Sequence, residues 1–275
     1  MKDPGRPIAM TVAGSDSCGG AGVQADLKTM AALGVHGMSA LTAVTAQSTA
    51  AVRASITLPA ELVRAQIDAA LEDARPLSTK TGMLPSKAVM EAVVESFTRH
   101  GLTNLVVDPV MVATSGSLLI EEEAVVAMRD MVVPLAELVT PNIPELGALT
   151  GLGTDTDSAI QTAAEALLEG GAANVLVKGG HREGAAVDIL YTERGVVRFS
   201  EERIGAGTLH GTGCTTSAAV ASFLARGFDL EESVGRAKRF VTESIRRAFP
   251  VGGGGSLLDQ TAAGRVVEVR RERTP

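Results

Sequence analysis

Residues 8–33 read IAMTVAGSDSCGGAGVQADLKTMAAL, which passes from a short apolar run through a glycine-rich segment into a helical pattern. The run from Ile8 to Ala13 predicts a buried strand, and Gly14 to Gly20 predicts a loop. From Ala21 to Leu33 the apolar side chains recur near one helical face, and Gly34 is suited to end the helix. This segment therefore predicts a strand, a loop and a helix, the unit from which α/β folds are built.

The same alternation continues along most of the chain. Further strands are expected at residues 35–47, 79–83, 105–107, 138–140 and 175–177, with a small hairpin at 187–191 and 196–199. Helices are expected at residues 59–71, 86–100, 121–133, 144–150 and 158–169. Strands that alternate with helices favour a mostly parallel sheet with helices on both faces, so the expected fold class is α/β.

The sequence shows no internal repeat and no linker rich in proline or serine, so residues 1–275 are expected to form one domain. Gly252 to Gly255 predicts a flexible turn or loop, and residues 265–275 form a charged tail that can be disordered. In open sheets of this class, ligands bind beyond the carboxyl ends of the strands. The polar residues considered below mostly follow strands, which predicts a shared site at that edge.

Composition excludes several classes of protein. The chain of 275 residues is 45% hydrophobic but only 3% aromatic, so its core must consist mainly of Ala, Val, Leu, Ile and Met. The formal net charge of −7 is opposite to the net positive charge that is typical of nucleic-acid-binding proteins. The longest apolar runs, such as residues 110–113, are far too short to cross a bilayer. We therefore expect neither nucleic acid nor membrane as a partner.

The two cysteines, Cys18 and Cys214, are too few for a cysteine-based zinc site, and their separation gives no ligand spacing. Free thiols in a reducing compartment are the simpler interpretation. Residues 1–4 contain no apolar signal region. These features predict a cytoplasmic protein.

The segment LHGTGCTTS, residues 209–217, precedes an alanine-rich helical pattern. Gly211 and Gly213 flank Thr212 where a loop becomes a helix, which points backbone N–H groups at an anion such as phosphate. Cys214 stands at the first helical positions, where the field of the helix favours its thiolate. An anion site beside a potential base indicates phosphoryl transfer. On this segment alone, a glycine-containing turn with a buried structural cysteine is an equally good interpretation.

The loop GSDSCGGAG, residues 14–22, is not a Walker A loop, because no Gly-Lys-Ser/Thr closes it. Its second half superficially resembles a dinucleotide fingerprint. It begins too far after the strand end, however, and no suitable acid follows at the required spacing. We expect a loop that folds over a small ligand, with a long turn as the alternative.

Two polar residues are candidates for contacts with a substrate. Asp26 lies in the first predicted helix, where it either accepts a hydrogen bond from substrate or is a solvated helix residue. Gln47 ends an otherwise apolar run. Its amide offers an acceptor and donors together, which matches a ring nitrogen beside an exocyclic amine. The alternative for Gln47 is a surface glutamine.

Three oxygen-bearing side chains are candidate ligands for Mg²⁺. Asp108 follows a buried strand, where an acid can hold Mg²⁺ through water or orient a nucleophile; a turn-forming Asp-Pro is the alternative. Asn142 and Glu145 follow the next strand at a spacing that allows both to face one site. Mg²⁺ needs few protein oxygens because it keeps several waters. The alternative for this pair is helix capping.

Two cationic or titratable residues are candidate phosphate contacts. Lys178 follows the strand at residues 175–177, and the glycines after it allow close approach to ATP phosphates. An exposed loop lysine is the alternative. His210 adjoins the glycine-rich helix start, where it either binds phosphate or positions the loop. The order of all these residues at predicted strand ends favours a kinase.

The chain also resembles the hydroxymethylpyrimidine/phosphomethylpyrimidine kinases of thiamine synthesis, within the ribokinase superfamily. The resemblance covers nearly the whole chain and depends on several short motifs taken together. These are residues 13–17 (AGSDS), 19–22 (GGAG), 24–29 (QADLKT), 43–47 (AVTAQ), 107–113 (VDPVMVA), 140–145 (TPNIPE), 177–181 (VKGGH) and 210–215 (HGTGCT).

The resemblance implies a ribokinase-like three-layer α/β/α sandwich that is usually a homodimer. It implies phosphorylation of the pyrimidine hydroxymethyl group, dependent on ATP and Mg²⁺, followed by phosphorylation of the monophosphate to the pyrophosphate. Gln47 corresponds to the pyrimidine-binding glutamine of the family and Met83 to the apolar wall of that pocket. We expect Gly14 and Asp26 at the same substrate site.

For the phosphate end, the resemblance implies that Asn142 and Glu145 carry the metal motif and that Lys178 contacts nucleotide phosphate. Cys214 stands where most members of the superfamily carry an aspartate base. In the mechanism that follows, N–H groups of residues 211–213 stabilise the transferring phosphoryl group, Asp108 assists at Mg²⁺, and Cys214 takes the hydroxyl proton. Helix-end stabilisation contributes only roughly 0.3–2 kcal/mol, so metal and lysine must supply much of the rest.

The chain departs from the family pattern at a few positions. Cys18 and Ser48 stand where Ser and Asn are more usual, and Leu209 where Thr is commoner. Residues 252–257 lack the histidines often found near the end. The competing functions are a pyridoxal or pyridoxine kinase, whose substrate is also a small aromatic heterocycle with a hydroxymethyl group, and a non-catalytic pyrimidine or nucleotide sensor.

Overall fold

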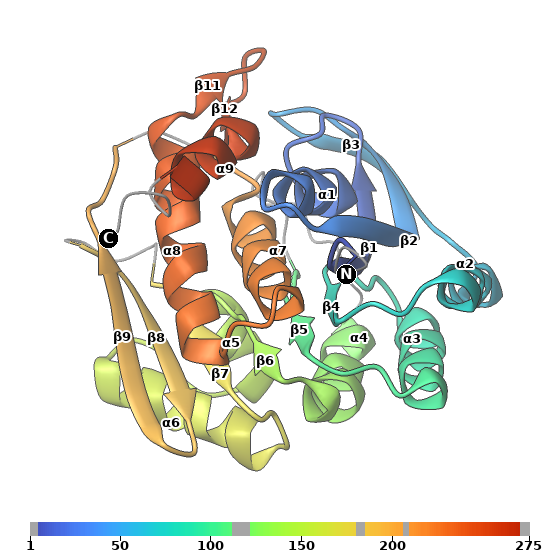
Figure 1. Ribbon diagram of the computed structural model, residues 1–275. Coiled ribbons are helices and arrows are strands. Elements are labelled where there is room, and N and C mark those ends of the chain that lie inside the picture. Colours follow the sequence, from blue (N-terminus) through green and yellow to red (C-terminus); the bar gives the residue numbers. More distant parts are fainter. Residues whose placement is uncertain (1–4, 112–121, 180–184, 206–208, 270–275) are drawn as a thin grey trace.

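The computed structural model describes residues 5–111, 122–179, 185–205 and 209–269. Its main sheet has nine strands in the order β3-β2-β1-β4-β5-β6-β7-β8-β9 (Figure 1). The strands are β1 (Ile8–Asp16), β2 (His36–Gln47), β3 (Val52–Thr57), β4 (Ser78–Thr81), β5 (Leu105–Val107), β6 (Leu138–Val139), β7 (Val175–Val177), β8 (Ala186–Thr192) and β9 (Gly195–Glu201). The six strands β1, β2 and β4–β7 are parallel, while β3, β8 and β9 add antiparallel pairs at the two edges.

Helices cover both faces of this sheet, as the alternating pattern predicts (Figure 1). One face carries α1 (Gly22–Ala32), α7 (Thr212–Ala225), α8 (Leu230–Arg246) and α9 (Gln260–Val269). The other face carries α2 (Ala60–Asp73), α3 (Lys87–His100), α4 (Glu122–Ala127), α5 (Ile143–Thr150) and α6 (Asp157–Glu169). The α/β class and the three-layer arrangement are therefore confirmed.

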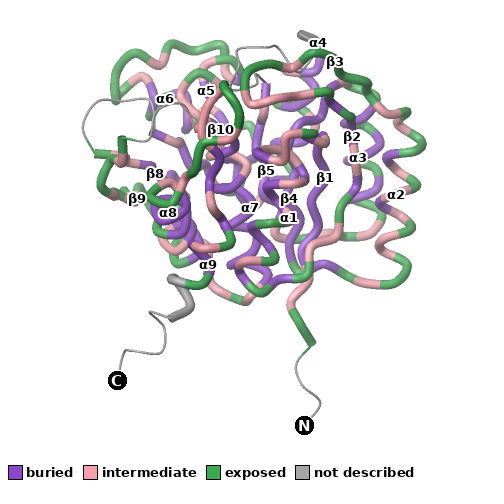
Figure 2. Tube along the Cα trace, turned by 90° about the horizontal axis from the view of Figure 1, so that it is seen from above, coloured by how far each residue is buried: buried purple, intermediate pink, exposed green. Residues whose placement is uncertain are grey.

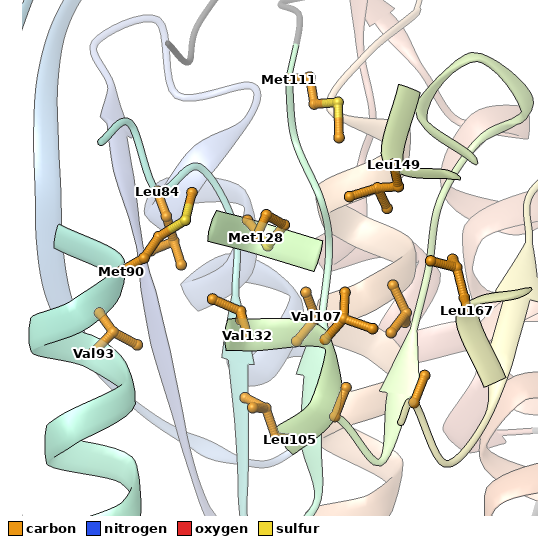
Figure 3. Packing of buried hydrophobic residues seen from close by; sticks show 14 of the residues in the cluster. Leu84, Met90, Val93, Leu105, Val107, Met111, Met128, Val132, Leu149 and Leu167 are labelled. Atoms are coloured by element: carbon orange, nitrogen blue, oxygen red, sulfur yellow. The ribbon is translucent and has the colours of Figure 1, made fainter. Parts of the chain in front are cut away.

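Two large hydrophobic clusters fill the spaces between the layers, and the residues of the central strands alternate between them. Leu105 and Val107 belong to the cluster under α2–α6, whereas Val106 between them belongs to the cluster under α7 and α8. Leu138 and Val139 divide in the same way. The alternation follows from the period of two along a strand. Figure 3 shows Leu105 and Val107 packed with aliphatic and methionine side chains of the first cluster.

The local ends of the helices follow from their sequence. Ser86 caps α3 by accepting a hydrogen bond from the backbone N of Val89 at 3.4 Å, and Gly101 ends that helix in the left-handed conformation. The helix expected at 121–133 is shorter than predicted: α4 is followed by a wide π-type turn at Met128–Val132 and a 3₁₀ turn at Val133–Leu135. Pro134 lacks the N–H that a continuing α-helix requires.

The C-terminal part differs from the sequence expectation. Residues 265–269, expected at the start of a disordered tail, lie within α9, while residues 270–275 are outside the described part. Residues 252–255 form the expected turn, between β11 (Phe249–Pro250) and β12 (Ser256–Leu257). β12 also pairs in parallel with β10 (Leu209–His210), which fixes the segment before α7. The small size of β10–β12 explains why apolar periodicity did not reveal them.

The order of the main sheet positions the site. β1 pairs with β2 on one side and with β4 on the other, so the chain reverses its direction across the sheet between these strands. Ligands in open α/β sheets bind at such a reversal, beyond the carboxyl ends of the strands. β1, β4 and β5 run through the buried centre of the molecule (Figure 2). Among the described helices, none combines the length and apolar character needed to cross a membrane.

Candidate active site

A cavity of about 720 Å³ lies at the carboxyl ends of the central strands and the N-terminus of α7. Twelve of the thirteen residues singled out from the sequence line it: Gly14, Gln47, Met83, Asp108, Asn142, Glu145, Lys178, His210, Gly211, Thr212, Gly213 and Cys214. Parallel strands bring their carboxyl ends to one edge, which is why residues far apart in the sequence meet here.

The N-terminus of α7 forms one wall of the cavity. Its cap residue, Gly211, has a φ of 86°, and a Cβ there would lie 1.8 Å from the carbonyl oxygen of Gly20. Glycine is therefore required both for the backbone conformation and for the close approach of the two loops. The first N–H groups of a helix have no acceptor within the helix. Those of Thr212, Gly213 and Cys214 can therefore bind an anion in the cavity.

A lysine and two carboxylates lie beside this helix start. Lys178 Nζ is 2.7 Å from Asp108 Oδ1 and 3.9 Å from Glu145 Oε2, and a Cβ on Gly213 would lie 3.3 Å from the same Nζ. Burial lowers the pKa of Lys178, but the attraction of Asp108 and Glu145 outweighs it and raises the pKa above its ordinary value. The lysine is therefore a cation within reach of any anion at α7.

Asp108 remains ionised in spite of its burial. Burial raises its pKa, but Lys178 and Lys80 more than compensate, and the net effect lowers the pKa below its ordinary value. Ser217 Oγ also donates to Asp108 Oδ2 at 3.1 Å. The carboxylate therefore contributes a fixed negative charge to the site.

Asn142 and Glu145 form a capping box at the start of α5. Asn142 Oδ1 accepts from the backbone N of Glu145 at 2.8 Å, and Glu145 Oε2 accepts from the backbone N of Asn142 at 2.8 Å. The structure thus shows the capping alternative, and both side chains nevertheless line the cavity. Burial raises the pKa of Glu145 to about 7, with Lys178 opposing the shift. Any cation nearby would favour its ionised form.

Asp26 is the residue whose expected role is corrected. Its carboxylate is fully buried, and Lys80 Nζ lies 3.0 and 2.8 Å from its two oxygens. Thr11 Oγ1 also donates to Asp26 Oδ2 at 2.6 Å. Asp26 does not line the cavity, because α1 turns it inward against β1 and β4, so a direct hydrogen bond to substrate is wrong for this structure.

Lys80 is a cavity residue that sequence reasoning missed. It lies in β4 and its side chain is fully buried, yet it lines the floor of the cavity. Burial lowers its pKa, and Asp26 raises it well above the ordinary value, so that the ammonium is retained. A lysine inside the short strand STKT, residues 78–81, was the available signal. A buried lysine requires a partner, and the sequence does not identify which acid supplies it.

Cys214 lies in the cavity wall beside these charges. The sequence predicted that the helix field would favour its thiolate. Burial instead raises the pKa of Cys214 to about 11, although Lys80 acts in the opposite direction. Removal of water from the thiol thus outweighs the attraction of nearby positive charge. At neutral pH the group is a thiol, which corrects that expectation.

In the same cavity, next to the cap residue of α7, Asp16, His210 and Gln47 form a hydrogen-bonded group. Burial raises the pKa of Asp16, but hydrogen bonds from His210, the backbone of Ala21 and Cys18 lower it to about 2. Because this carboxylate only accepts, His210 must donate its Nε2–H to Asp16 Oδ2, at 2.9 Å. These contacts support the alternative in which His210 positions its loop rather than binding phosphate.

The protonated Nε2 of His210 also determines how the Gln47 amide must lie. The end of the Gln47 amide that lies 3.1 Å from His210 Nε2 must be its oxygen, because two N–H groups cannot bond to each other. In this orientation the amide oxygen shares the single Nε2–H of His210 with Asp16 Oδ2. The amide NH₂ then donates to Thr45 Oγ1, which itself donates to the carbonyl of Ser15 at 2.9 Å. The hydrogen-bond network thus fixes the orientation of the amide.

Met83 and Gly14 pack against each other beside Gln47. A Cβ on Gly14 would lie 2.4 Å from Met83 Cε, so glycine there leaves room for the methionine side chain. Met83 is 7% exposed, which leaves a small apolar surface toward the cavity. The cavity lining therefore combines an amide and an apolar surface with cations and a helix N-terminus.

The family model described as phosphomethylpyrimidine kinase matches residues 16–259. A bifunctional thiamine biosynthesis protein of Geobacter sulfurreducens is 45% identical over 266 residues, covering 96% of this chain, which spans only 54% of that longer protein. The hydroxymethylpyrimidine/phosphomethylpyrimidine kinase of Streptomyces coelicolor is 44% identical over 253 residues, covering 92% of this chain and 94% of the relative.

Solved structures give the same picture of the fold. The pyridoxal kinase of Staphylococcus aureus, crystallised in complex with AMP-PCP and pyridoxal, aligns with a TM-score of 0.87 and 31% identity. The alignment covers 95% of this chain and 96% of that one. The neighbour thus holds an ATP analogue and a small aromatic substrate in a molecule of the same architecture.

Proposed function

Because this chain belongs to the phosphomethylpyrimidine kinase family, we propose that it transfers the terminal phosphoryl group of ATP to 4-amino-5-hydroxymethyl-2-methylpyrimidine, and then phosphorylates the monophosphate. The observation that carries the proposal is that one cavity combines two sets of lining residues. Lys178 and the start of α7 can bind phosphate, and we call them the phosphate end; Gln47 and Met83 can bind an aromatic ring, and we call them the substrate end. The product of both steps is the pyrimidine pyrophosphate used in thiamine biosynthesis.

At the substrate end, Gln47 recognises the polar edge of the pyrimidine and Met83 packs on its ring. His210 holds the Gln47 oxygen, and the amide NH₂ uses one hydrogen on Thr45, so its second hydrogen remains for the substrate. Gly14 contributes by leaving space for Met83. The ring is thereby oriented so that its hydroxymethyl group points toward α7.

At the phosphate end, Lys178 and the N–H groups of residues 211–213 neutralise charge on the ATP phosphates. Phosphoryl transfer passes through a loose transition state in which positioning and electrostatic stabilisation dominate. Hydrogen-bond donors that already point at a charge developing in the transition state each stabilise that state by several kcal/mol when water is excluded from the site. The lysine and the helix start are preorganised in this sense, because Asp108 fixes Lys178 and Gly211 fixes the loop.

The residues around Asp108 fit a magnesium ion held partly through water. Asp108, Asn142 and Glu145 supply the hard oxygen donors that Mg²⁺ prefers. The Lys178 ammonium already lies against both carboxylates, which favours water-mediated contacts over direct coordination by both acids. When bound, Mg²⁺ offsets negative charge on the nucleotide phosphates.

Cys214 receives the hydroxyl proton in the first step. With a pKa of about 11, forming the thiolate in advance at pH 7 costs about 5 kcal/mol, which equals the largest rate gain expected from a general base. We therefore propose that the small fraction of Cys214 present as thiolate, stabilised by Lys80 and Lys178, is the reactive form, and that it accepts the hydroxyl proton to become a thiol while the phosphoryl group is transferred. The second step needs no such base, since its acceptor is already a phosphate anion.

The single domain, the homodimer and the cytoplasmic location expected from the sequence are part of the same proposal. Pyridoxal kinase activity is the second candidate, favoured by the structural likeness to an enzyme crystallised with pyridoxal. The Gln47 amide favours the aminopyrimidine, because it pairs with a ring nitrogen and an exocyclic amine.

A coupled ATP assay with hydroxymethylpyrimidine tests the proposal, with mono- and diphosphate products resolved chromatographically. We expect both products, and competition with pyridoxal should show the lower KM for the aminopyrimidine. Phosphorylation of pyridoxal alone would establish the second candidate. Binding of pyrimidine without ATP turnover would indicate a sensor and would refute the kinase.

A further inference from the structure

The loop between β1 and α1 brings three different metal-binding side chains together. A carboxylate oxygen of Asp16, the Sγ of Cys18 and a ring nitrogen of His210 all lie within 4.8 Å of one another. Asp16 ends β1, Cys18 follows in the glycine-rich loop, and His210 comes from β10. The phosphoryl-transfer mechanism makes no use of the Cys18 thiol.

The carboxylate oxygen at the centre of this cluster accepts more hydrogen bonds than it has lone pairs. Asp16 Oδ2 accepts from Cys18 Sγ at 3.2 Å and from His210 Nε2 at 2.9 Å. It also accepts from the backbone N of Gly20 at 3.0 Å and of Ala21 at 2.8 Å. A carboxylate has about four lone-pair sites on its two oxygens together. Two of these four donors, the thiol and the imidazole, are groups that a metal ion can take over.

We propose that Asp16, Cys18 and His210 form a binding site for Zn²⁺, with a water molecule from the cavity as the fourth ligand. Zinc prefers thiolate, imidazole and carboxylate ligands in a tetrahedron. Its usual bond lengths place neighbouring ligand atoms about 3.3–3.6 Å apart. The distances of 3.2 and 2.9 Å from Asp16 Oδ2 require only a small expansion of the cluster.

The surroundings match what a zinc site of this kind needs. The backbone N–H groups of Gly20 and Ala21 hold the carboxylate in place, as outer hydrogen bonds do for metal ligands. A Cβ on Gly20 would lie 2.4 Å from His210 Cδ2, so the loop packs directly on the imidazole. Asp16 and His210 both line the cavity, which gives the fourth position access to water.

Proton balance follows from the donor roles in the metal-free protein. Zn²⁺ replaces the thiol proton of Cys18, which is released to solvent, and a Zn–S bond forms. The Nε2 proton of His210 moves to Nδ1 or is released, so that Nε2 can bind the metal. A coordinated thiol is deprotonated outright. Binding therefore strengthens with pH.

This site was invisible in the sequence, where the two cysteines gave no zinc spacing. One cysteine contributes, and its partners come from 2 and 192 positions away. Cys18 also stands where the resembling family more often has serine. A serine hydroxyl keeps the donor to Asp16 but is a poor zinc ligand, so Cys18→Ser is a matched variant.

The test uses the untagged full-length chain, kept reduced with a phosphine and stripped of metal. Zn²⁺ binding is measured by equilibrium dialysis against a chelating indicator, for the unchanged chain, Cys18→Ser and Cys214→Ser. We expect about one Zn²⁺ per chain and a thiolate-to-metal charge-transfer band when Co²⁺ replaces it. Removing a residue that only hydrogen-bonds to a zinc ligand lowers zinc affinity 10–100-fold. Cys18→Ser removes a direct ligand, so it should weaken Zn²⁺ binding roughly 100-fold or more. Cys214→Ser should leave it unchanged.

Thermal unfolding supplies a second measurement on the same samples. Zn²⁺ should raise the Tm of the unchanged chain and of Cys214→Ser, but not that of Cys18→Ser, whose metal-free Tm verifies its fold. Titration calorimetry in two buffers should show fewer protons released by Cys18→Ser. Equal Zn²⁺ affinity in Cys18→Ser, equal loss in both cysteine variants, or no stoichiometric binding at all would overturn the proposal. None of these outcomes bears on the kinase reaction.

Discussion

Lys80 Nζ lies 2.8 Å from Asp26 Oδ2, and both side chains are fully buried beneath the cavity. The attraction between the two charges offsets the free-energy cost of removing them from water only while both partners are present. Lys80 also approaches Cys214 closely enough to lower the pKa of that thiol. The pair thus has two roles: it fixes α1 on the sheet, and it contributes positive charge next to the Cys214 thiol.

Replacing one partner of this pair should destabilise the fold. In Lys80→Met the Asp26 carboxylate remains buried without its cation, which should cost about 3–5 kcal/mol in the free energy of unfolding. The double variant Lys80→Met, Asp26→Leu removes both charges and should recover most of that loss. Urea unfolding of the three proteins measures this. A loss below about 1 kcal/mol in the single variant would show that the pair is not ionic.

Two glycines at the start of α7 should respond differently to alanine. Gly211→Ala forces a side chain into a left-handed backbone and against the Gly20 carbonyl, so it should lose at least about 2 kcal/mol of stability. Gly213→Ala meets the flexible end of Lys178 at 3.3 Å and Asp108 Oδ2 at an ordinary contact distance of 3.9 Å, so it should fold normally. The methyl group of the new alanine pushes Lys178 away from the start of α7. The two groups then no longer act on the same phosphoryl group, which should lower kcat roughly tenfold or more. Normal kcat in Gly213→Ala would exclude this helix start as the phosphoryl site.

Alkylation of Cys214 should be slow at neutral pH. With a pKa of about 11, only about one molecule in 10⁴ carries the thiolate at pH 7, and the iodoacetamide rate should rise nearly tenfold per pH unit up to about pH 10. Intact-mass spectrometry in the Cys18→Ser background follows this thiol alone. A rate that levels off near pH 8 would indicate that the helix field, rather than burial, controls the group.

The two phosphorylation steps should depend differently on Cys214. Cys214→Ala removes the proton acceptor needed by the hydroxymethyl substrate, so the first step should slow more than the second. The second step starts from a phosphate anion and should slow by much less. Separate assays with pyrimidine and its monophosphate measure the ratio, and an equal loss in both steps would remove the base role.

Asp16 should make the stability depend on acidity. Its pKa of about 2 lies below the unfolded value of 3.8, so ionised Asp16 contributes about 2 kcal/mol that is present above pH 4 and is lost as pH falls through 2. The difference in unfolding free energy between the unchanged chain and Asp16→Asn should therefore shrink between pH 4 and 2. A constant difference over this range would mean that His210 and the loop N–H groups do not stabilise the charged form.

Much of this protein follows from its sequence. Apolar runs of three to six residues, separated by amphipathic helices, determine the layered α/β class. The short runs form buried strands, and each amphipathic helix has one apolar face that must be buried against the sheet. Because ligands bind beyond the ends of parallel strands, the sequence alone predicts that Asp108, Lys178 and the start of α7 lie together. Twelve of the thirteen residues named from the sequence line the cavity.

What the tertiary structure alone decided is the state of the charged and titratable groups. Burial depends on every element packed around a side chain, so no local pattern revealed that Asp26 faces Lys80 or that the Cys214 pKa rises. Likewise, the contact of His210 with Asp16 joins positions 194 residues apart through the small strand β10, which has no periodicity to detect. Periodicity is a local property of the chain, whereas hydration and ion pairing are set by neighbours that only folding brings together.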